Sequence, residues 1–356
     1  MENDQIMRRK VRVLFSSNKN PNFETFTDYI EKAFKEVGCE IVFFENRDFV
    51  IPGRIRDRFA FLHDFDINIL NKRVLKMAHD FKPDLFLEDG GWNILPKTLN
   101  VLKGAGIKTA LWTNDPPRDL LAEFEPIKNA APCYDFVFIT GTEAVEPFQD
   151  INELHLLPFA CDPDFQKPVM LTDTDKKAYK SDVCFVGSGH VEIYPDRIRL
   201  LESLAELNID LSVWGPGWET LPDTSPLKKK ICGSSLKTAA WVRLFSAAKI
   251  IFHSHYQDPL GGYANYQVNP RVFEALACGA FLLVDDQKDI RTLFQEDEHL
   301  VIYHNAADLK KKVLYYIEND TERKRIAENG RREVLQNHTY RHRVEQILTI
   351  TGLAKE

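Results

Sequence analysis

The residues best suited to chemistry lie between Asn269 and Gly279, where the pattern predicts a short helix between a loop and a buried strand. Asn269 can cap this helix, Pro270 suits its first position, and Gly279 can adopt the left-handed conformation that ends it. The amino end of a helix offers amide groups and a positive dipole to an anion. Arg271 stands in the first turn, where a carboxylate would be electrostatically better. A cation there indicates an anion supplied from outside.

Four further candidate binding residues lie at or after the ends of predicted strands in the same half of the chain. Gly187 and Ser188 precede a helix and could cradle a phosphate with backbone amides, or could form a simple turn. Arg197, one turn into that helix, could reach phosphate or could be a solvated surface residue. Trp214 could stack on a base or could be a packing residue.

His253 also ends a predicted strand and is expected on the same edge of the sheet. His255 follows two residues later, and we expect its side chain on the opposite face. A metal site shared by the two rings is therefore not predicted.

Two aspartates follow predicted strands in the first half of the chain, and a carboxylate in such a position can serve as a base for a hydroxyl group. Asp115 is the first choice and Asp89 the second, although each could instead be a turn or cap residue. Asp64 and Asp66 form a D-x-D pattern, but Asp66 is expected to cap a helix that begins at Ile67. No metal-ligating residues are predicted.

The stretch from Val268 to Leu283 resembles the nucleotide-binding signature of the glycosyltransferase group-1 superfamily, and most closely its CgeB-type branch (spore-maturation, YkvP-like). The resemblance is strongest over residues 182–342, from the Val-Cys-Phe-Val-Gly-Ser run at 183–188 to the run at 334–342. The first half is similar more loosely, through residues 111–116 and 157–163.

The resemblance implies a hexosyltransferase-like enzyme of the GT-B fold, with a nucleotide-diphosphate sugar as donor substrate, no cofactor, and retention of anomeric configuration. Glu274 corresponds to the superfamily glutamate that accepts hydrogen bonds from the ribose hydroxyls. Tyr266 stands where many members have a second glutamate that contacts the sugar, which leaves the identity of the donor sugar open.

Predicted strands and helices alternate along the chain, and they must position these residues. Short apolar runs typical of buried strands alternate with helical stretches, which predicts βαβ units and parallel sheets. Expected strands are residues 12–15, 40–44, 84–87, 107–112, 135–139, 183–186, 209–214, 249–252 and 280–284. Expected helices are residues 23–37, 67–81, 95–103, 196–207, 238–247, 269–278 and much of 308–350.

These two series predict an α/β protein with two Rossmann-like, doubly wound parallel-sheet domains and an interdomain cleft. Residues 1–165 would form the acceptor-side domain, 166–181 a polar linker that follows prolines 158 and 163 and contains Pro168, and 182–337 the donor domain. Residues 338–356 would form a C-terminal helix that could pack back on the first domain. The mixed charges of the tail favour a solvated helix face over a basic surface for anionic lipid or acceptor.

Composition narrows the class of protein. The 356 residues suffice for two domain cores, and the net charge of −7 argues against nucleic acid as a main partner. The six cysteines show no metal-binding spacing, and several sit in apolar runs, which suits buried reduced thiols. The sequence has no signal-peptide core and no bilayer-spanning segment, so we expect a cytoplasmic protein with at most peripheral membrane contact.

The expected function is transfer of a sugar from a nucleotide-diphosphate donor to a hydroxyl of a glycan, protein or lipid-linked acceptor, without a metal. Two alternatives remain. A nucleotide-sugar epimerase would share the fold and the donor but would need no acceptor. A non-catalytic two-lobed sugar-binding protein would bind free sugar and ignore the nucleotide.

Overall fold

The computed structural model describes residues 9–354, apart from residues 22, 57, 115–123, 235, 237–239 and 260–263. The chain divides into two compact units. Unit 1 comprises Met1–Thr140, Ala144–Leu157 and Arg341–Glu356, and unit 2 comprises Gly141–Glu143 and Pro158–Tyr340. The chain therefore passes from unit 1 into the long segment of unit 2 after Leu157, whereas the sequence predicted the end of the first domain at residue 165.

Unit 1 contains a parallel sheet that has six strands in the described part of the chain, in the order β2-β1-β3-β4-β5-β6. Its strands are β1 (Arg12–Ser17), β2 (Glu40–Glu45), β3 (Leu85–Asp89), β4 (Lys108–Thr113), β5 (Phe136–Ile139) and β6 (Leu154–Leu156). The strand order reverses between β1 and β3, because β1 connects to β2 on one side and the later strands lie on the other.

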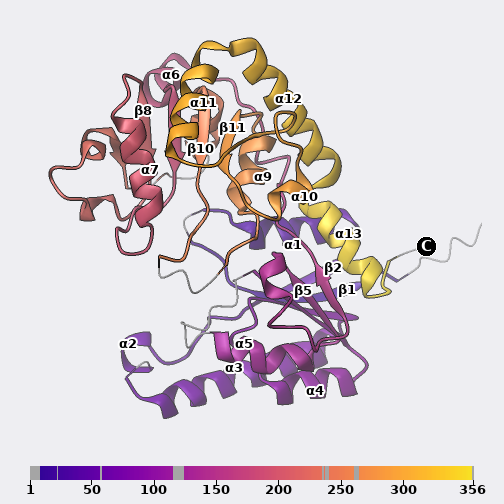
Figure 1. The fold of residues 1–356 in the computed structure, drawn as a ribbon. Coiled ribbons are helices and arrows are strands. Elements are labelled where there is room, and N and C mark those ends of the chain that lie inside the picture. Colours follow the sequence, from indigo (N-terminus) through magenta and orange to yellow (C-terminus); the bar gives the residue numbers. More distant parts are fainter. Residues whose placement is uncertain are drawn as a thin grey trace, which may run out of the picture. The chain divides into compact units, whose positions relative to one another are not determined.

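Helices cover both faces of this sheet. They are α1 (Phe26–Glu36), α2 (Gly53–Arg56), α3 (Ala60–Phe81), α4 (Pro96–Gly104), α5 (Phe124–Ala130) and, from Arg341 onward, α13 (Tyr340–Ile350). Figure 1 shows α3, α4 and α5 on one face and α1 on the other. The α3–α5 face buries one apolar cluster against the strands, including Leu70, Val74, Leu99, Leu14 and Phe86.

Helix α3 begins seven residues earlier than the sequence pattern predicts, at Ala60 instead of Ile67. Asp66 therefore lies inside the helix and does not cap it. Its buried carboxylate accepts hydrogen bonds from the backbone amides of Val50 (2.8 Å) and Ile51 (3.0 Å). The side chain ties the preceding loop to the helix, a role that a local pattern does not reveal.

Unit 2 contains a second parallel sheet, six-stranded in the described residues, in the order β12-β11-β10-β7-β8-β9. Its strands are β7 (Val183–Val186), β8 (Leu211–Trp214), β9 (Ile231–Gly233), β10 (Ile250–His253), β11 (Leu282–Asp285) and β12 (Val301–Tyr303). The first strand of the unit, β7, is central, and the order reverses between β7 and β10. This is the doubly wound arrangement of a dinucleotide-binding fold.

Helices also cover both faces of the second sheet (Figure 1). They are α6 (Asp173–Tyr179), α7 (Pro195–Ala205), α8 (Ala240–Ala247), α9 (Pro270–Ala277), α10 (Ile290–Leu293), α11 (Ala306–Glu318) and α12 (Asp320–Asn337). One core packs α8, α9 and the end of α12 on the strands, and the other packs α7 and α11 on the opposite face. Strands buried on both faces explain the unbroken apolar runs.

The stretch predicted as a linker, residues 166–181, is part of unit 2 and contains α6. Thr172 and Asp175 form a capping box at the start of this helix, and Asp175 also lies 3.7 Å from Arg243 of α8. The polar residues that suggested a linker therefore include those of a capped surface helix.

Charges in the C-terminal helices largely pair with their neighbours. On α12, Arg323 and Lys324 both contact Asp320, at 2.8 and 2.7 Å, and Arg325 contacts Glu322 at 2.8 Å. This supports the solvated-face interpretation of the tail over a basic binding surface.

Two compositional expectations can be checked directly. All six cysteines lie within the described residues and none forms a disulfide, and four of them are buried. In the described parts of the chain, no helix combines the length and apolar character needed to cross a bilayer.

Candidate functional site

Ligands of doubly wound sheets lie beyond the carboxyl ends of the strands, where the strand order reverses. In unit 2 this point lies between β7 and β10, and α9 begins after the loop that follows β10. The amino end of α9 therefore lies at the carboxyl edge of the sheet.

The caps of α9 are as predicted. The Asn269 side-chain oxygen accepts a hydrogen bond from the Arg271 amide (2.9 Å), and Pro270 is the first helical residue. Gly279 has φ +70° just after the helix, in the left-handed region that favours glycine. The start and the end of this helix are thus fixed by local sequence.

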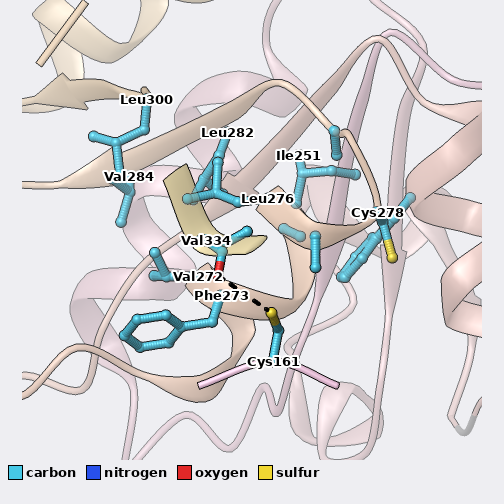
Figure 2. Close-up of a cluster of buried hydrophobic side chains, with 14 of the residues drawn as sticks. Cys161, Ile251, Val272, Phe273, Leu276, Cys278, Leu282, Val284, Leu300 and Val334 are labelled. Carbon is cyan, nitrogen blue, oxygen red and sulfur yellow. Dashed lines mark hydrogen bonds between the residues drawn. The ribbon is translucent and has the colours of Figure 1, made fainter. Parts of the chain in front are cut away.

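A buried face anchors α9 to the sheet. Figure 2 shows Val272, Phe273 and Leu276 packed among strand residues and Val334 of α12. The Cys161 thiol donates to the Val334 carbonyl oxygen at 4.0 Å in the same cluster. Because these side chains are almost fully buried, the remaining residues of α9 are held in fixed positions.

Arg271 and Glu274, on that helix, form an ion pair with 2.8 Å between Nη1 and Oε2. The Arg271 guanidinium also lies 5.3 Å from the Trp241 ring and 5.6 Å from the Phe245 ring. Burial raises the pKa of Glu274, and the charge of Arg271 partly offsets that rise. The two residues predicted to bind ribose and phosphate therefore contact each other.

His255 links two elements of this edge and was not among the predicted site residues. Its Nδ1 lies 2.7 Å from the Asp285 carboxylate at the end of β11, and its Nε2 accepts from the Asn269 amide at 3.2 Å. Accepting at Nε2 places the proton of a neutral ring on Nδ1. Burial alone would raise the pKa of Asp285, but its interactions with His255, which donates hydrogen bonds to it from the ring and the backbone amide, bring the pKa below its usual value.

His253, the last residue of β10, is buried, and burial together with His255 lowers its pKa well below the usual value. Its ring lies 4.7 Å from the His255 ring, in a T-shaped arrangement. The expectation of opposite faces was wrong, because side chains two residues apart in an extended segment share a face. His253 Nε2 has no hydrogen-bond partner within the described structure.

Gly187 and Ser188 follow β7 as predicted, but the amide of Gly187 donates to the Trp214 carbonyl oxygen (2.9 Å). Arg197 is buried, and burial lowers its pKa. Its guanidinium donates to the carbonyl oxygens of Ser188 (2.9 Å) and Ser254 (2.8 Å), and so joins the ends of β7 and β10. In this structure Arg197 holds the loops at the reversal point.

The Trp214 loop packs closely on the glycine loop. A side chain at Gly215, whose φ is +133°, would meet the Gly187 carbonyl oxygen at 2.2 Å. Trp218 donates from its indole nitrogen to that same oxygen at 3.0 Å. The Trp214 ring lies 6.0 Å from the Tyr179 ring of α6 and packs against the core. The glycines here permit close packing of the two loops, Trp218 bonds one loop to the other, and Trp214 packs on α6 and the core.

A cavity of about 400 Å³ opens at the same edge of unit 2, on the α7 and α11 side of the sheet. Its lining includes Asp196 of α7, Ser254 after β10, Asp285 at the end of β11 and Tyr303 at the end of β12. None of the binding residues predicted from sequence lines this cavity within the described structure. The polar cluster of α9 adjoins it through Asp285 and His255.

In unit 1, Asp89 ends β3 at the reversal point of the first sheet. It is buried, and its carboxylate accepts hydrogen bonds from Ser17 (2.6 Å) and Asn114 (2.8 Å). Glu88, beside it, is fully buried, and burial raises its pKa well above the usual value. Glu88 was not predicted as a site residue, although the acidic pair at a strand end was a usable signal. Asp115 lies outside the described residues.

Glu143 is a second carboxylate that local sequence did not single out. It lies on the short Gly141–Glu143 segment of unit 2 and accepts from the Tyr266 amide at 3.2 Å. Burial, and secondarily the charge of Asp289, raise its pKa to about 7. Asp289 itself accepts from the amide and hydroxyl of Thr142, at 2.7 and 2.6 Å. A group titrating near neutral pH therefore contacts the loop that leads to α9.

The described residues contain no group of three or more histidine, cysteine, aspartate or glutamate side chains placed to hold a metal ion. His255 and Asp285 are partners, but they satisfy each other and the Asn269 amide.

Part of the chain is similar in sequence to a known protein family. A family model described as glycosyl transferase-like matches residues 197–349, which include most of unit 2 and all of α9. None of the curated proteins matches the chain in sequence.

Several solved structures share the fold. Sucrose-phosphate synthase from Thermosynechococcus elongatus has a TM-score of 0.68 at 11% identity, over 96% of this chain and 98% of that one. Anabaena HepE, in complex with UDP and glucose, has a TM-score of 0.63 at 14% identity, over 97% and 100%. A glycosyltransferase from Rickettsia africae has a TM-score of 0.65 at 13% identity, over 96% and 98%. These similarities confirm the predicted GT-B fold, and with the family match they support the glycosyltransferase group-1 superfamily.

Proposed function

We propose that the chain is a glycosyltransferase that binds a nucleotide-diphosphate sugar in unit 2 and transfers the sugar to a hydroxyl-bearing acceptor. The observation that carries the proposal is the α9 cluster. A capped helix amino end, the Arg271–Glu274 pair and the His255 link meet at the edge where such sheets bind nucleotides. The family match over residues 197–349 supports it.

In this mechanism Glu274 accepts hydrogen bonds from the two ribose hydroxyls, since a carboxylate can accept from adjacent donors. Arg271 and the amides of the α9 amino end stabilise charge on the departing diphosphate. The ion pair at 2.8 Å keeps both side chains at the helix surface before the donor binds. His255 fixes the Asn269 amide, and with it the start of the helix.

We infer a UDP-type or related nucleotide sugar as donor, because HepE was solved with UDP and with UDP-glucose. A hexosyltransferase with retention of configuration is the form we propose. A trehalose-6-phosphate synthase, described as transferring a glycosyl group with retention, has a similar fold (TM-score 0.66, 9% identity), and this similarity supports the proposed retention. The assignment to the CgeB-type branch rests on the sequence resemblance.

Asp115 and Asp89 remain the proposed bases for the acceptor hydroxyl, and unit 1 the proposed acceptor side. A carboxylate at a strand end suits proton removal. Asp89 is already held in one orientation by Ser17 and Asn114.

The experiment is a transfer assay with a panel of nucleotide sugars and of hydroxyl acceptors, with release of nucleoside diphosphate as the readout. Release that depends on an acceptor supports the proposal. Formation of an epimeric nucleotide sugar without acceptor would point to an epimerase. Binding of free sugar without any response to nucleotide would point to a non-catalytic sugar-binding protein.

We also propose that transfer needs no metal ion. Arg271 and the dipole of α9 can stabilise the charge of the leaving group in place of a metal. Excess chelator should leave the transfer rate nearly unchanged. A rate that collapses with chelator and returns with manganese would contradict a metal-free mechanism.

A further inference from the structure

Unit 1 exposes an apolar surface that no part of the proposed chemistry uses. Five of the fourteen large apolar side chains exposed in the described part of the chain fall within residues 50–65, so exposed apolar residues are concentrated in one short stretch. They are Val50, Ile55, Phe59, Phe61 and Phe65. We call these five residues, with the arginines of the same stretch, the α2–α3 surface.

The aromatic rings of the α2–α3 surface belong to one short region. Phe61 and Phe65 are four residues apart in the first turns of α3, so they lie on the same side of the helix. They are 67% and 57% exposed, values unusual for phenylalanine in a folded domain. The Phe59 and Phe61 rings lie 5.8 Å apart.

Arginines are interleaved with these rings. Arg54 and Arg58 are exposed, and the Arg58 guanidinium lies 6.0 Å from the Phe59 ring. Residues 50–65 carry three arginines and two aspartates, a net charge of +1 within a chain of net charge −7. The local charge is thus opposite in sign to that of the whole protein.

We propose that the α2–α3 surface binds an anionic lipid bilayer peripherally. Exposed phenylalanine and isoleucine side chains can enter the boundary between headgroups and acyl chains, while neighbouring arginines contact lipid phosphates. Acidic lipids complement a local positive charge, and each basic residue near the surface adds to the attraction. The surface is short and contains no spanning helix, so the contact is with one leaflet. This inference does not depend on the proposed function.

The test is cosedimentation of the full chain with vesicles of phosphatidylcholine, with and without phosphatidylglycerol. The wild type should bind the anionic vesicles more tightly and lose affinity as salt is raised. Replacing both aromatic side chains (Phe61→Ser with Phe65→Ser) should weaken binding by about tenfold or more. Reversing two charges (Arg54→Glu with Arg58→Glu) should weaken binding to anionic vesicles alone.

A matched control is Leu314→Ser with Tyr315→Ser, because these side chains on α11 are also about half exposed, at 50% and 54%. The control should bind vesicles as the wild type does. Equal loss in the control, or no vesicle binding by the wild type, overturns the proposal. If the wild type self-associates in solution and the Phe61/Phe65 variant does not, without vesicle binding, the surface is an interface between copies and the proposal fails.

Discussion

Replacing Glu274 by alanine tests whether its carboxylate binds ribose, and the structure alters what the variant should do. Glu274 is 15% exposed and pairs with Arg271, which is 27% exposed. Removing the carboxylate leaves a partly buried guanidinium without its charged partner, at a cost of roughly 1–3 kcal/mol in folding. Earlier melting of Glu274→Ala is therefore expected and does not count against a binding role.

Binding must then be separated from folding. Loss of charge-assisted hydrogen bonds to ribose should cost about 1.5–3 kcal/mol, or roughly tenfold to more than a hundredfold in affinity. Calorimetric titration at a temperature well below the melting transition of Glu274→Ala gives this number directly. Glu274→Gln keeps an acceptor for Arg271, so it should fold better than the alanine variant and still bind more weakly than the wild type.

Comparing ribose and 2′-deoxyribose nucleotides tests the contact between Glu274 and the sugar more directly. A 2′-deoxyribose nucleotide should bind the wild type more weakly than the ribose form, and the difference should shrink in Glu274→Ala. Glu322→Ala is a matched control, since Glu322 also pairs with an arginine in unit 2 but on exposed α12. If Glu274→Ala remains as sensitive to the 2′-hydroxyl as the wild type, Glu274 does not contact ribose and the assignment is refuted.

Three other outcomes follow from the same geometry. His255→Ala removes side-chain hydrogen bonds to Asp285 and from the Asn269 amide, about 1 kcal/mol each, so nucleotide affinity in titrations should fall by up to about thirtyfold. Unchanged affinity would remove His255 from the site. Asp115→Asn or Asp89→Asn should slow transfer by about a hundredfold at unchanged nucleotide affinity, and normal turnover in both would exclude them as bases. The folded protein holds the Glu143 proton up to a pKa of about 7, whereas the unfolded chain releases it near 4.5, so wild-type stability should fall as pH rises through that window. Denaturant unfolding at about pH 5 and about pH 8 should show Glu143→Gln gaining roughly 2 kcal/mol relative to the wild type, and a pH-independent difference would contradict the raised pKa.

Local sequence was enough to place α9, because its start and end depend on side chains within the helix and its flanks. Asn269, Pro270 and Gly279 each act on the backbone next to them. The central strands were similarly legible, since burial on both faces leaves a continuous apolar run. Short edge strands such as β6, β9 and β12 were missed, because three residues carry too little pattern to separate strand from loop.

Side chains whose partners lie far along the chain could not be assigned from sequence. The carboxylate of Asp66 serves amides fifteen and sixteen residues away, and Arg197 reaches the Ser254 carbonyl across the sheet. His255 joins Asp285 to Asn269, a connection that exists only once β10, β11 and α9 are in place. Residue type and spacing predicted that the carboxyl edge of the second sheet is polar. Tertiary contacts determine which polar groups meet at that edge.

The central claim, that unit 2 binds a nucleoside diphosphate, is tested most directly by thermal unfolding of the wild type in the presence of UDP, GDP, ADP and dTDP. A ligand at a hundred times its Kd should stabilise the folded protein by about 2.7 kcal/mol and raise the melting temperature by a few degrees. We expect such a shift with at least one of the four nucleotides. Unchanged melting with every nucleotide would contradict a nucleotide-sugar donor site in this protein.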